Sequence, residues 1–167
     1  MIEGYQIIDN FLNQEEFNNY NICFSPEISM TYNCAVADSE DNEFFLLGHV
    51  LHQGYEVLSP HFETLAIPLL NKINFKALIR ARINWYPKWH EVVEHKPHND
   101  LPYEHAVLLY YPNTNNGFTR LHGADNGKDV VINSVANRVV IFNGSIKHNS
   151  TTCSDEHLRC SVNINLV

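Results

Sequence analysis

Three groups of residues in the second half of the chain have types and spacing that suit a metal site beside an anion-binding site. The first is His98-Asn99-Asp100, the second is His148, 48 residues after Asp100 (148 − 100), and the third is Arg159. Two histidines and one carboxylate can hold one face of a metal ion and leave other positions open, a ligand set that suits non-haem Fe(II). An arginine guanidinium grips carboxylates with two parallel hydrogen bonds. The order and spacing therefore predict a metal centre with a carboxylate-binding arginine.

Taken singly, each group has an ordinary explanation. His98 and Asp100 could form a polar turn between two prolines, and His148 could be a surface histidine. A competing metal motif is the segment from His90 to His95, which resembles the zincin pattern H-E-x-x-H but is one residue too long. Histidines five apart do not share a helix face as residues four apart do, so this second motif is disfavoured.

Length and composition predict one globular domain spanning residues 1–167. Of the 167 residues, 44% are hydrophobic and 18% are charged, which is ordinary for a folded protein. The N-terminus shows no basic segment followed by an apolar one, and no apolar run approaches the roughly 20 residues of a membrane span, so a cytoplasmic protein is predicted. The net charge of −8 disfavours a nucleic-acid partner. The four cysteines form no C-x-x-C pair and are predicted to be free thiols.

The first 76 residues are predicted to be a mainly helical support region. A helix should start at Asn13 and run to about Cys23, and another should start at Ser59-Pro60 and cover residues 60–74. Residues 5–8 and 29–37 suggest extended chain, while residues 40–53 are ambiguous because a helical stripe of apolar residues is interrupted by a glycine.

From residue 77 onward, the apolar pattern changes to a period of two, which is typical of strands. Eight strands are predicted in the core region, residues 77–167, at 77–86, 91–95, 105–111, 117–121, 129–133, 138–142, 148–152 and 159–166. The predicted fold class is mostly β (α+β), as a double-stranded β-helix or jelly roll with the helices packed outside.

Alternation along two of these strands predicts a polar interior pocket. One face of each strand carries polar residues, namely Arg80, Arg82, Asn84 and Tyr86 on the first and Arg159, Ser161, Asn163 and Asn165 on the last. The alternative is that these faces simply meet water, as in half-exposed antiparallel sheets.

The motifs together resemble those of the Fe(II)/2-oxoglutarate-dependent dioxygenases, in the prolyl 4-hydroxylase-like branch. The similarity is greatest to the small stand-alone members of marine phages and bacteria, and it covers residues 77–167 well. The residues that carry it are Asn84-Trp85-Tyr86-Pro87, His98-Asn99-Asp100, Leu109-Tyr110-Tyr111-Pro112-Asn113, Asn115-Asn116-Gly117-Phe118-Thr119, the segment from Ala136 to Phe142, His148 and Arg159-Cys160-Ser161.

The resemblance implies a role for each site residue. His98, Asp100 and His148 would bind Fe(II). Arg159 would bind the distal carboxylate of 2-oxoglutarate, and Tyr111 and Ser161 would assist it, with Tyr110 as the alternative to Tyr111. Tyr86 would lie near the cofactor or substrate. One departure from the family pattern is a single glycine, Gly117, where a glycine pair is common.

The implied reaction is hydroxylation of a C–H bond with release of succinate and CO2, supported by ascorbate. The resemblance suggests a peptidyl side chain, proline among the candidates, as one substrate class, and a free amino acid or small metabolite as another. Two alternatives stay open at this point. One is a non-catalytic jelly-roll module that binds a metal or ligand, and the other is a nucleic-acid demethylase, which the acidic balance disfavours.

Overall fold

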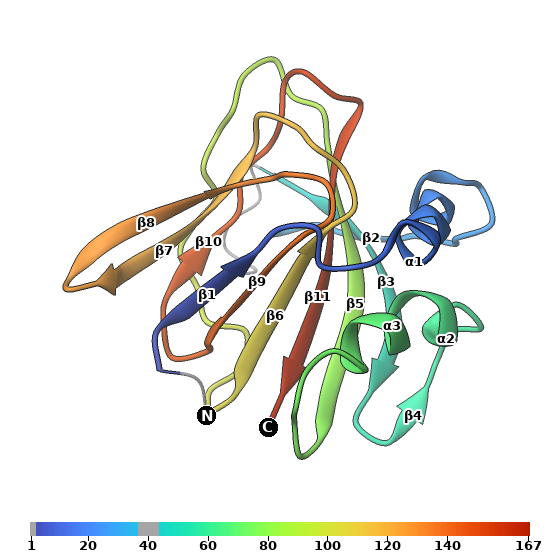
Figure 1. Ribbon diagram of the computed structural model, residues 1–167. Coiled ribbons are helices and arrows are strands. Elements are labelled where there is room, and N and C mark those ends of the chain that lie inside the picture. The colour runs from blue at the N-terminus through green and yellow to red at the C-terminus, as the bar shows by residue number, and fades with distance from the viewer. Residues whose placement is uncertain (1–2, 37–43) are drawn as a thin grey trace.

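Two antiparallel sheets form the body of the molecule (Figure 1). The computed structural model describes residues 3–36 and 44–167. The large sheet has the strand order β1 (Tyr5–Ile8), β9 (Arg138–Asn143), β6 (Ala106–Tyr111), β11 (Leu158–Leu166), β5 (Leu78–Pro87), β3 (Leu46–Gln53) and β2 (Thr31–Asn33), with β4 (Glu56–Val57) paired to β3. The small sheet has the order β10 (His148–Asn149), β7 (Phe118–Asp125) and β8 (Lys128–Asn133). The predicted mostly β, jelly-roll class is confirmed.

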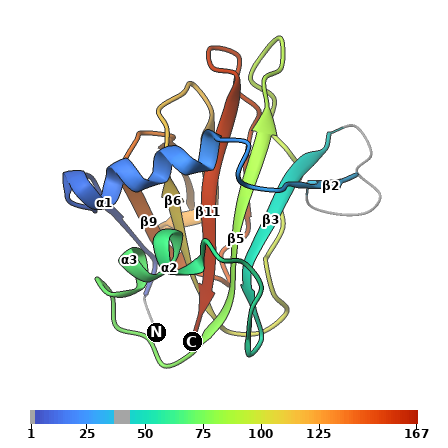
Figure 2. The same cartoon turned by 90° about the vertical axis from the view of Figure 1, so that its right-hand side faces the viewer.

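The helical segments cover one face of the large sheet (Figure 2). They are α1 (Gln14–Asn18), the 3-10 segment η1 (Asn19–Phe24), α2 (Phe62–Leu65) and α3 (Ile67–Leu70). Their buried side chains, such as Tyr20 and Leu69, share one core cluster with Ile83 of β5 and with Val162 and Ile164 of β11. The apolar faces of β5 and β11 therefore point toward the helices, which leaves their polar faces to the other side of the sheet.

The helices are shorter than the sequence suggests. The first begins as predicted, because the Asn13 side chain accepts a hydrogen bond from the Glu16 backbone while the Glu16 side chain accepts one from the Asn13 backbone. It changes to a 3-10 turn at Asn19 instead of continuing as an α-helix to Cys23. The predicted helix 60–74 is divided into α2 and α3. Pro68 explains the break, since proline cannot donate a helical hydrogen bond and is tolerated only in the first turn, where α3 places it.

The N-terminal region is more than helical support, because β1, β2 and β3 all extend the large sheet. Residues 46–53 of the ambiguous segment form β3, while residues 40–43 of it lie outside the described chain. The pairing of β3 with β5 shifts register between Val50 and His52. Such a bulge changes which side chains face inward, so buried Leu46 and Leu51 lie five apart and break the period of two that a regular strand would show.

Two predicted strands are largely absent. Residues 91–95 form no strand, and of residues 148–152 only His148 and Asn149 do. Isolated bridges instead pair Glu94 with Thr151 and His98 with His148. No helix among the described residues is long and apolar enough to cross a membrane.

Candidate metal and carboxylate-binding site

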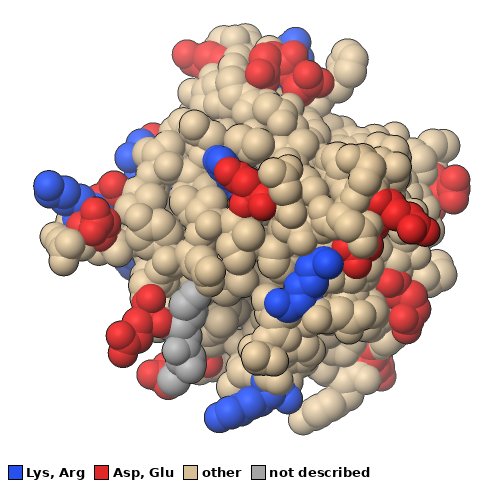
Figure 3. Space-filling view, viewed as in Figure 1, with Lys and Arg blue, Asp and Glu red and all other residues tan. Residues whose placement is uncertain are grey.

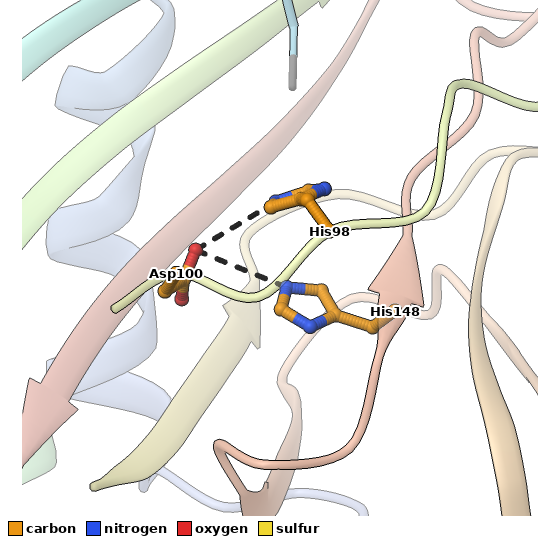
Figure 4. A group of neighbouring side chains, drawn as sticks. All are labelled: His98, Asp100 and His148. Carbon is orange, nitrogen blue, oxygen red and sulfur yellow. Dashed lines mark ion pairs between the residues drawn. The ribbon is translucent and has the colours of Figure 1, made fainter. Parts of the chain in front are cut away.

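The three predicted metal ligands lie together (Figure 4). One ligand atom from each of His98, Asp100 and His148 falls within 4.8 Å of the others. The Oδ1 atom of Asp100 is 3.7 Å from Nε2 of His98 and 3.9 Å from Nε2 of His148. No other group of three or more His, Cys, Asp or Glu side chains with this proximity occurs in the described part of the chain. The arrangement gives a divalent metal two imidazole nitrogens and one carboxylate oxygen on one side.

A local backbone pairing brings the two histidines together. The backbone N–H of His98 donates to the carbonyl of His148 at 2.9 Å, and the N–H of His148 donates back to the carbonyl of His98 at 2.9 Å. Residues 98–100 lie on no regular strand, since His98 forms an isolated bridge in an otherwise irregular segment. The reciprocal bonds nevertheless fix both imidazoles above the same residue, Asp100.

Asp100 is oriented by neighbours on the large sheet. Its Oδ2 atom accepts hydrogen bonds from the Nδ2 atoms of Asn163, at 3.1 Å, and Asn165, at 2.8 Å, while Arg80 lies 3.5 Å from Oδ1. Burial raises the pKa of Asp100, but the interaction with His98 and the charges of His148 and Arg80 outweigh burial and hold the pKa well below its usual range. The carboxylate is thus ionised, with its supporting bonds concentrated on the oxygen that faces away from the histidines.

His148 is held in the neutral form that a metal ligand requires. Burial lowers its pKa to about 4, against the opposing charge of Asp100. Its Nδ1 atom lies 3.4 Å from the carbonyl of Ile146, which leaves Nε2 directed toward Asp100. A neutral imidazole can bind a metal without first releasing a proton.

The polar faces of β5 and β11 line a cavity that also contains the triad. Its walls include Arg82, Asn84 and Tyr86 from β5, Arg159, Ser161 and Asn163 from β11, and Thr119 from β7, besides His98, Asp100 and His148. The prediction of a polar interior pocket is confirmed, and the alternative of a solvated strand face is wrong for these positions. Both strands are central in the large sheet, and the small sheet covers this side of it (Figure 1).

Arg159 is a buried cation without an acidic partner. Its side chain is 0% exposed. Its Nε donates to Ser134 Oγ at 2.8 Å and its Nη2 to Thr119 Oγ1 at 2.9 Å, whereas the buried Nη1 has no partner. No ion pair joins it to any described carboxylate. An unpaired buried charge is costly, so the arginine fits a site completed by an anionic ligand.

The other residues expected around that anion lie near Arg159. Ser161 is 1% exposed, lines the pocket, and has a buried Oγ without a partner. The guanidinium carbon of Arg159 stacks 5.1 Å from the ring of Tyr86 and 5.5 Å from that of Tyr111. These unpaired donors fit a carboxylate ligand, which accepts several hydrogen bonds.

The two adjacent tyrosines point to opposite sides of β6. Tyr111 faces Arg159, and its hydroxyl donates to Thr119 Oγ1 at 2.8 Å. Tyr110 instead packs 4.7 Å from the ring of Tyr20 in the helical core. Thr119 joins Arg159 to Tyr111, and sequence reasoning assigned it no role. Its signals in the sequence were its place at the end of the motif from Asn115 to Thr119 and a polar type at an inward position of a strand.

An apolar cavity of about 240 Å³ adjoins the polar pocket at Tyr86, which lines both. Phe44, Trp89 and His95 form part of its wall. Burial and the nearby charge of Arg159 lower the pKa of His95 to about 3, so this histidine is neutral too. His90, the other histidine of the zincin-like segment, is an exposed residue beside Glu91 and belongs to no metal-binding group among the described residues.

Surface charge gives no sign of a nucleic-acid interface on the face shown in Figure 3. Lysine and arginine side chains lie there as separate spots interspersed with acidic ones. Phosphate-backbone binding needs basic groups clustered along a surface, which this face does not provide.

No protein-family model matches the sequence, and no curated protein matches it significantly. Solved structures do share its fold. An oxidoreductase of the 2OG-Fe(II) oxygenase family from Burkholderia pseudomallei has a TM-score of 0.72 at 13% identity, over 97% of this chain and 84% of its own. A prolyl hydroxylase from Trichoplax adhaerens, solved with a hypoxia-inducible-factor peptide, has a TM-score of 0.69 at 17% identity, over 98% and 83%.

A third structure is HygX from Streptomyces hygroscopicus, solved with nickel, 2-oxoglutarate and hygromycin B. Its TM-score is 0.65 at 12% identity, over 98% of this chain and 82% of its own. At these identities, the likeness concerns the fold, which is that of 2-oxoglutarate- and Fe(II)-dependent oxygenases. The resemblance suggested by the sequence motifs is thus confirmed at the level of the fold.

Proposed function

We propose that this chain is an Fe(II)- and 2-oxoglutarate-dependent oxygenase that hydroxylates a C–H bond of its substrate. The observation that carries the proposal is a single pocket with two complementary ends. At one end, His98, Asp100 and His148 converge, and at the other lies the buried, unpaired cation of Arg159. One end suits a divalent metal, and the other suits a dicarboxylate whose second end reaches that metal.

Each residue has a defined task in this proposal. Bound Fe(II) supplies the redox chemistry by which O2 and 2-oxoglutarate give succinate, CO2 and a hydroxylated substrate, with one oxygen atom entering each organic product. Arg159 binds and orients the distal carboxylate, and Ser161 adds a hydrogen bond. Thr119 and Tyr111 keep the guanidinium in place. Tyr86 separates the polar pocket from the apolar cavity and restricts the entry of water.

The side chains at the metal end of the pocket are already oriented by hydrogen bonds and burial within the protein. Asn163 and Asn165 hold one oxygen of Asp100, so the other oxygen faces the two imidazoles. His148 is neutral at physiological pH. Preorganised ligands of this kind lower the cost of capturing the metal.

The fold accepts more than one substrate class. One similar structure holds a peptide and another holds the small molecule hygromycin B. A peptidyl side chain, including proline, and a small metabolite are therefore both compatible with the proposed activity.

Succinate formation tests the proposal. Purified protein is incubated with Fe(II), 2-oxoglutarate, ascorbate and O2, and succinate is measured against anaerobic and metal-free controls. We expect slow succinate release without substrate, stimulated by a cell extract that supplies candidate substrates, and no release by His148→Ala. A wild-type protein that binds metal and 2-oxoglutarate but never forms succinate would contradict the proposal and favour a non-catalytic binding module. Omitting ascorbate tests its supporting role separately.

A further inference from the structure

A second arginine in the pocket lacks a partner. Arg82 lies on β5 directly across from Asn163 of β11, and Tyr86 on β5 lies across from Arg159. Four residues along a strand span about 13 Å, so Arg82 is well separated from the end of the pocket that holds Arg159. Because the Asn163 amide binds Asp100, Arg82 lies at the metal end.

The neighbouring arginine shows what is unusual about Arg82. Arg80 lies 3.5 Å from Asp100 and donates to Asn165 Oδ1 at 2.9 Å. Arg82 has no hydrogen bond or ion pair with any residue that the structure describes, and its Nε atom is buried. Arg82 also lines the cavity, so a ligand in the pocket can reach it.

Two unpaired acceptors lie beside this cation. Asn84 is 2% exposed and Asn163 is 6% exposed, and the Oδ1 atom of each is buried without a partner. Both side chains line the same cavity as Arg82. Buried polar atoms in folded proteins are normally paired, so three unpaired atoms on one wall point to a ligand with matching groups. Water at the surface could solvate the tip of Arg82, but it would not account for the two buried asparagine oxygens.

Charge balance indicates what that ligand carries. Among the residues that the structure describes around the pocket, Arg80, Arg82 and Arg159 face one carboxylate, Asp100. In the proposed function, the two positive charges of Fe(II) and the two negative charges of 2-oxoglutarate cancel, so the excess of arginine remains after both are bound. An additional anion in the loaded pocket would reduce this excess.

We propose that Arg82 binds a carboxylate of the primary substrate, and that Asn84 and Asn163 accept hydrogen bonds from an N–H or O–H group near it. This inference rests on the proposed function and narrows its substrate to an α-amino or α-hydroxy acid. A free amino acid and the C-terminal residue of a peptide share this chemistry, whereas an internal residue of a polypeptide lacks the carboxylate.

Binding to the non-turnover complex tests the substrate class. Protein loaded with Ni(II) and 2-oxoglutarate is titrated calorimetrically with the proteinogenic amino acids, with their carboxamides, and with dipeptides that end in the same residues. We expect at least one acid to bind at least about tenfold more tightly than its carboxamide, the difference that one charge-assisted pair supplies. Preference for the dipeptide over the amino acid would identify a peptide C-terminus as the source.

Variants assign the effect to Arg82. Arg82→Met should remove the preference for the acid, and Arg82→Lys should keep part of it and serves as a second variant if the first folds poorly. Arg138→Met is the matched control, because Arg138 pairs with Asp9 outside the pocket. The 2-oxoglutarate dissociation constant, measured in the same titrations, should change less than about threefold in Arg82→Met.

Three results would overturn the inference. The first is that the wild type binds no acid, or binds acid and carboxamide equally. The second is that Arg82→Met keeps the preference for the acid. The third is that Arg82→Met loses much of its affinity for 2-oxoglutarate, which would make Arg82 a ligand of the cosubstrate. Failure of the proposed function is separate, because it appears as absent succinate formation in the iron-loaded wild type, and the Ni(II) titrations require no turnover.

Discussion

At the scale of single residues, Arg159 determines how the proposed cosubstrate is held. Its fixed partners, Ser134 and Thr119, are both neutral, so its positive charge is left for a ligand. We expect Arg159→Gln to raise the 2-oxoglutarate concentration for half-maximal succinate formation by about a hundredfold, since a charge-assisted bond contributes about 1.5–3 kcal/mol. Metal affinity should stay within about threefold, because the triad is untouched.

The matched control for this change is Arg138→Gln, which removes a cation from the surface pair with Asp9. Its half-saturation point should equal that of the wild type. If Arg159→Gln also leaves the half-saturation point unchanged, the anchoring role belongs to Arg80 or Arg82 instead.

Asn165 supports the metal ligands without touching the metal. It donates to Asp100 Oδ2 and accepts from Arg80, so it fixes the carboxylate and its counter-ion together. We expect Asn165→Ala to weaken Mn(II) binding by about tenfold, as is usual when such a supporting bond is lost. Anaerobic metal titration gives the measurement. Asn133→Ala, an exposed asparagine on β8, is the control, and equal affinities in both variants would exclude the supporting role.

The residues of the candidate site were easier to predict from the sequence than the bounds of the helices and strands. His98, Asp100, His148, Arg159 and Ser161 line one pocket. Their residue types and spacing indicated them, and strand alternation supported Arg159 and Ser161 on β11. The contacts made by Thr119 and Ser134 were not foreseen. They depend on which strands face each other across the two sheets, and alternation within a strand carries no information about that.

At the scale of elements, the loop before β7 shapes the pocket. A Cβ atom added to Gly117 would lie 2.7 Å from Cδ of Arg159 and 2.8 Å from both Asn115 Oδ1 and the Thr152 carbonyl. We expect Gly117→Ala to lower the free energy of unfolding by about 1–3 kcal/mol, the usual cost of overpacking. It should also weaken 2-oxoglutarate binding, because the clash falls on the anchoring arginine.

Gly127→Ala provides the contrast for this prediction. Gly127 has a φ of 81° and no atom within 4 Å of its added Cβ, so alanine there is strained but touches nothing in the pocket. Both variants should unfold at lower urea concentration, and calorimetry should show weakened 2-oxoglutarate binding only in Gly117→Ala. Equal 2-oxoglutarate affinity in the two variants would contradict the argument.

Element boundaries were less predictable than site residues. The break at Pro68 could have been predicted from the sequence, since proline interrupts a continuous helix. The bulge in β3 was not, because a register shift arises from pairing with β5. Residues 91–95 have strand-like composition but no available partner strand. Their backbone is held through bonds to residues 150–152, and the Glu94 side chain accepts bonds from Arg120 and Asn149.

At the scale of the whole molecule, buried neutral histidines couple stability to pH. The pKa values of His95 and His148 fall from 6.5 in the unfolded chain to about 3 and about 4 in the folded one. Between pH 6.5 and 4.5, the unfolded chain therefore binds protons that the folded chain does not. The free energy of unfolding of the metal-free protein should fall as the pH falls, by up to about 1.4 kcal/mol per pH unit for each histidine.

Urea unfolding across this pH range measures the slope. His95→Phe should flatten it by about half, since one of the two histidines no longer takes up a proton on unfolding. His90→Gln is the control, because exposed His90 faces solvent in both states. A slope in His95→Phe equal to that of the wild type would show that burial of His95 does not contribute.

The fold class could be predicted from the change of apolar pattern along the chain, but the order of the strands in the sheets could not. The switch to a period of two near residue 77 predicted a mostly β fold, which the sheets confirm. Nothing local indicated that β1 and β3 would join the same sheet, since those pairings join residues at least 27 positions apart (80 − 53).

Strand β11 follows every other strand in the sequence, yet it lies between β6 and β5 in the middle of the large sheet. During synthesis on the ribosome, the strands on either side of it have no common partner until residues 158–166 emerge. Without β11, the strands β1, β9 and β6 on one side and β5, β3 and β2 on the other have no shared partner, and apolar surface left open at such a stage favours aggregation. Arg159 and Asn163 belong to that same strand, so the pocket is completed in the same step as the sheet, and a chain that lacks β11 has no site for the proposed cosubstrate.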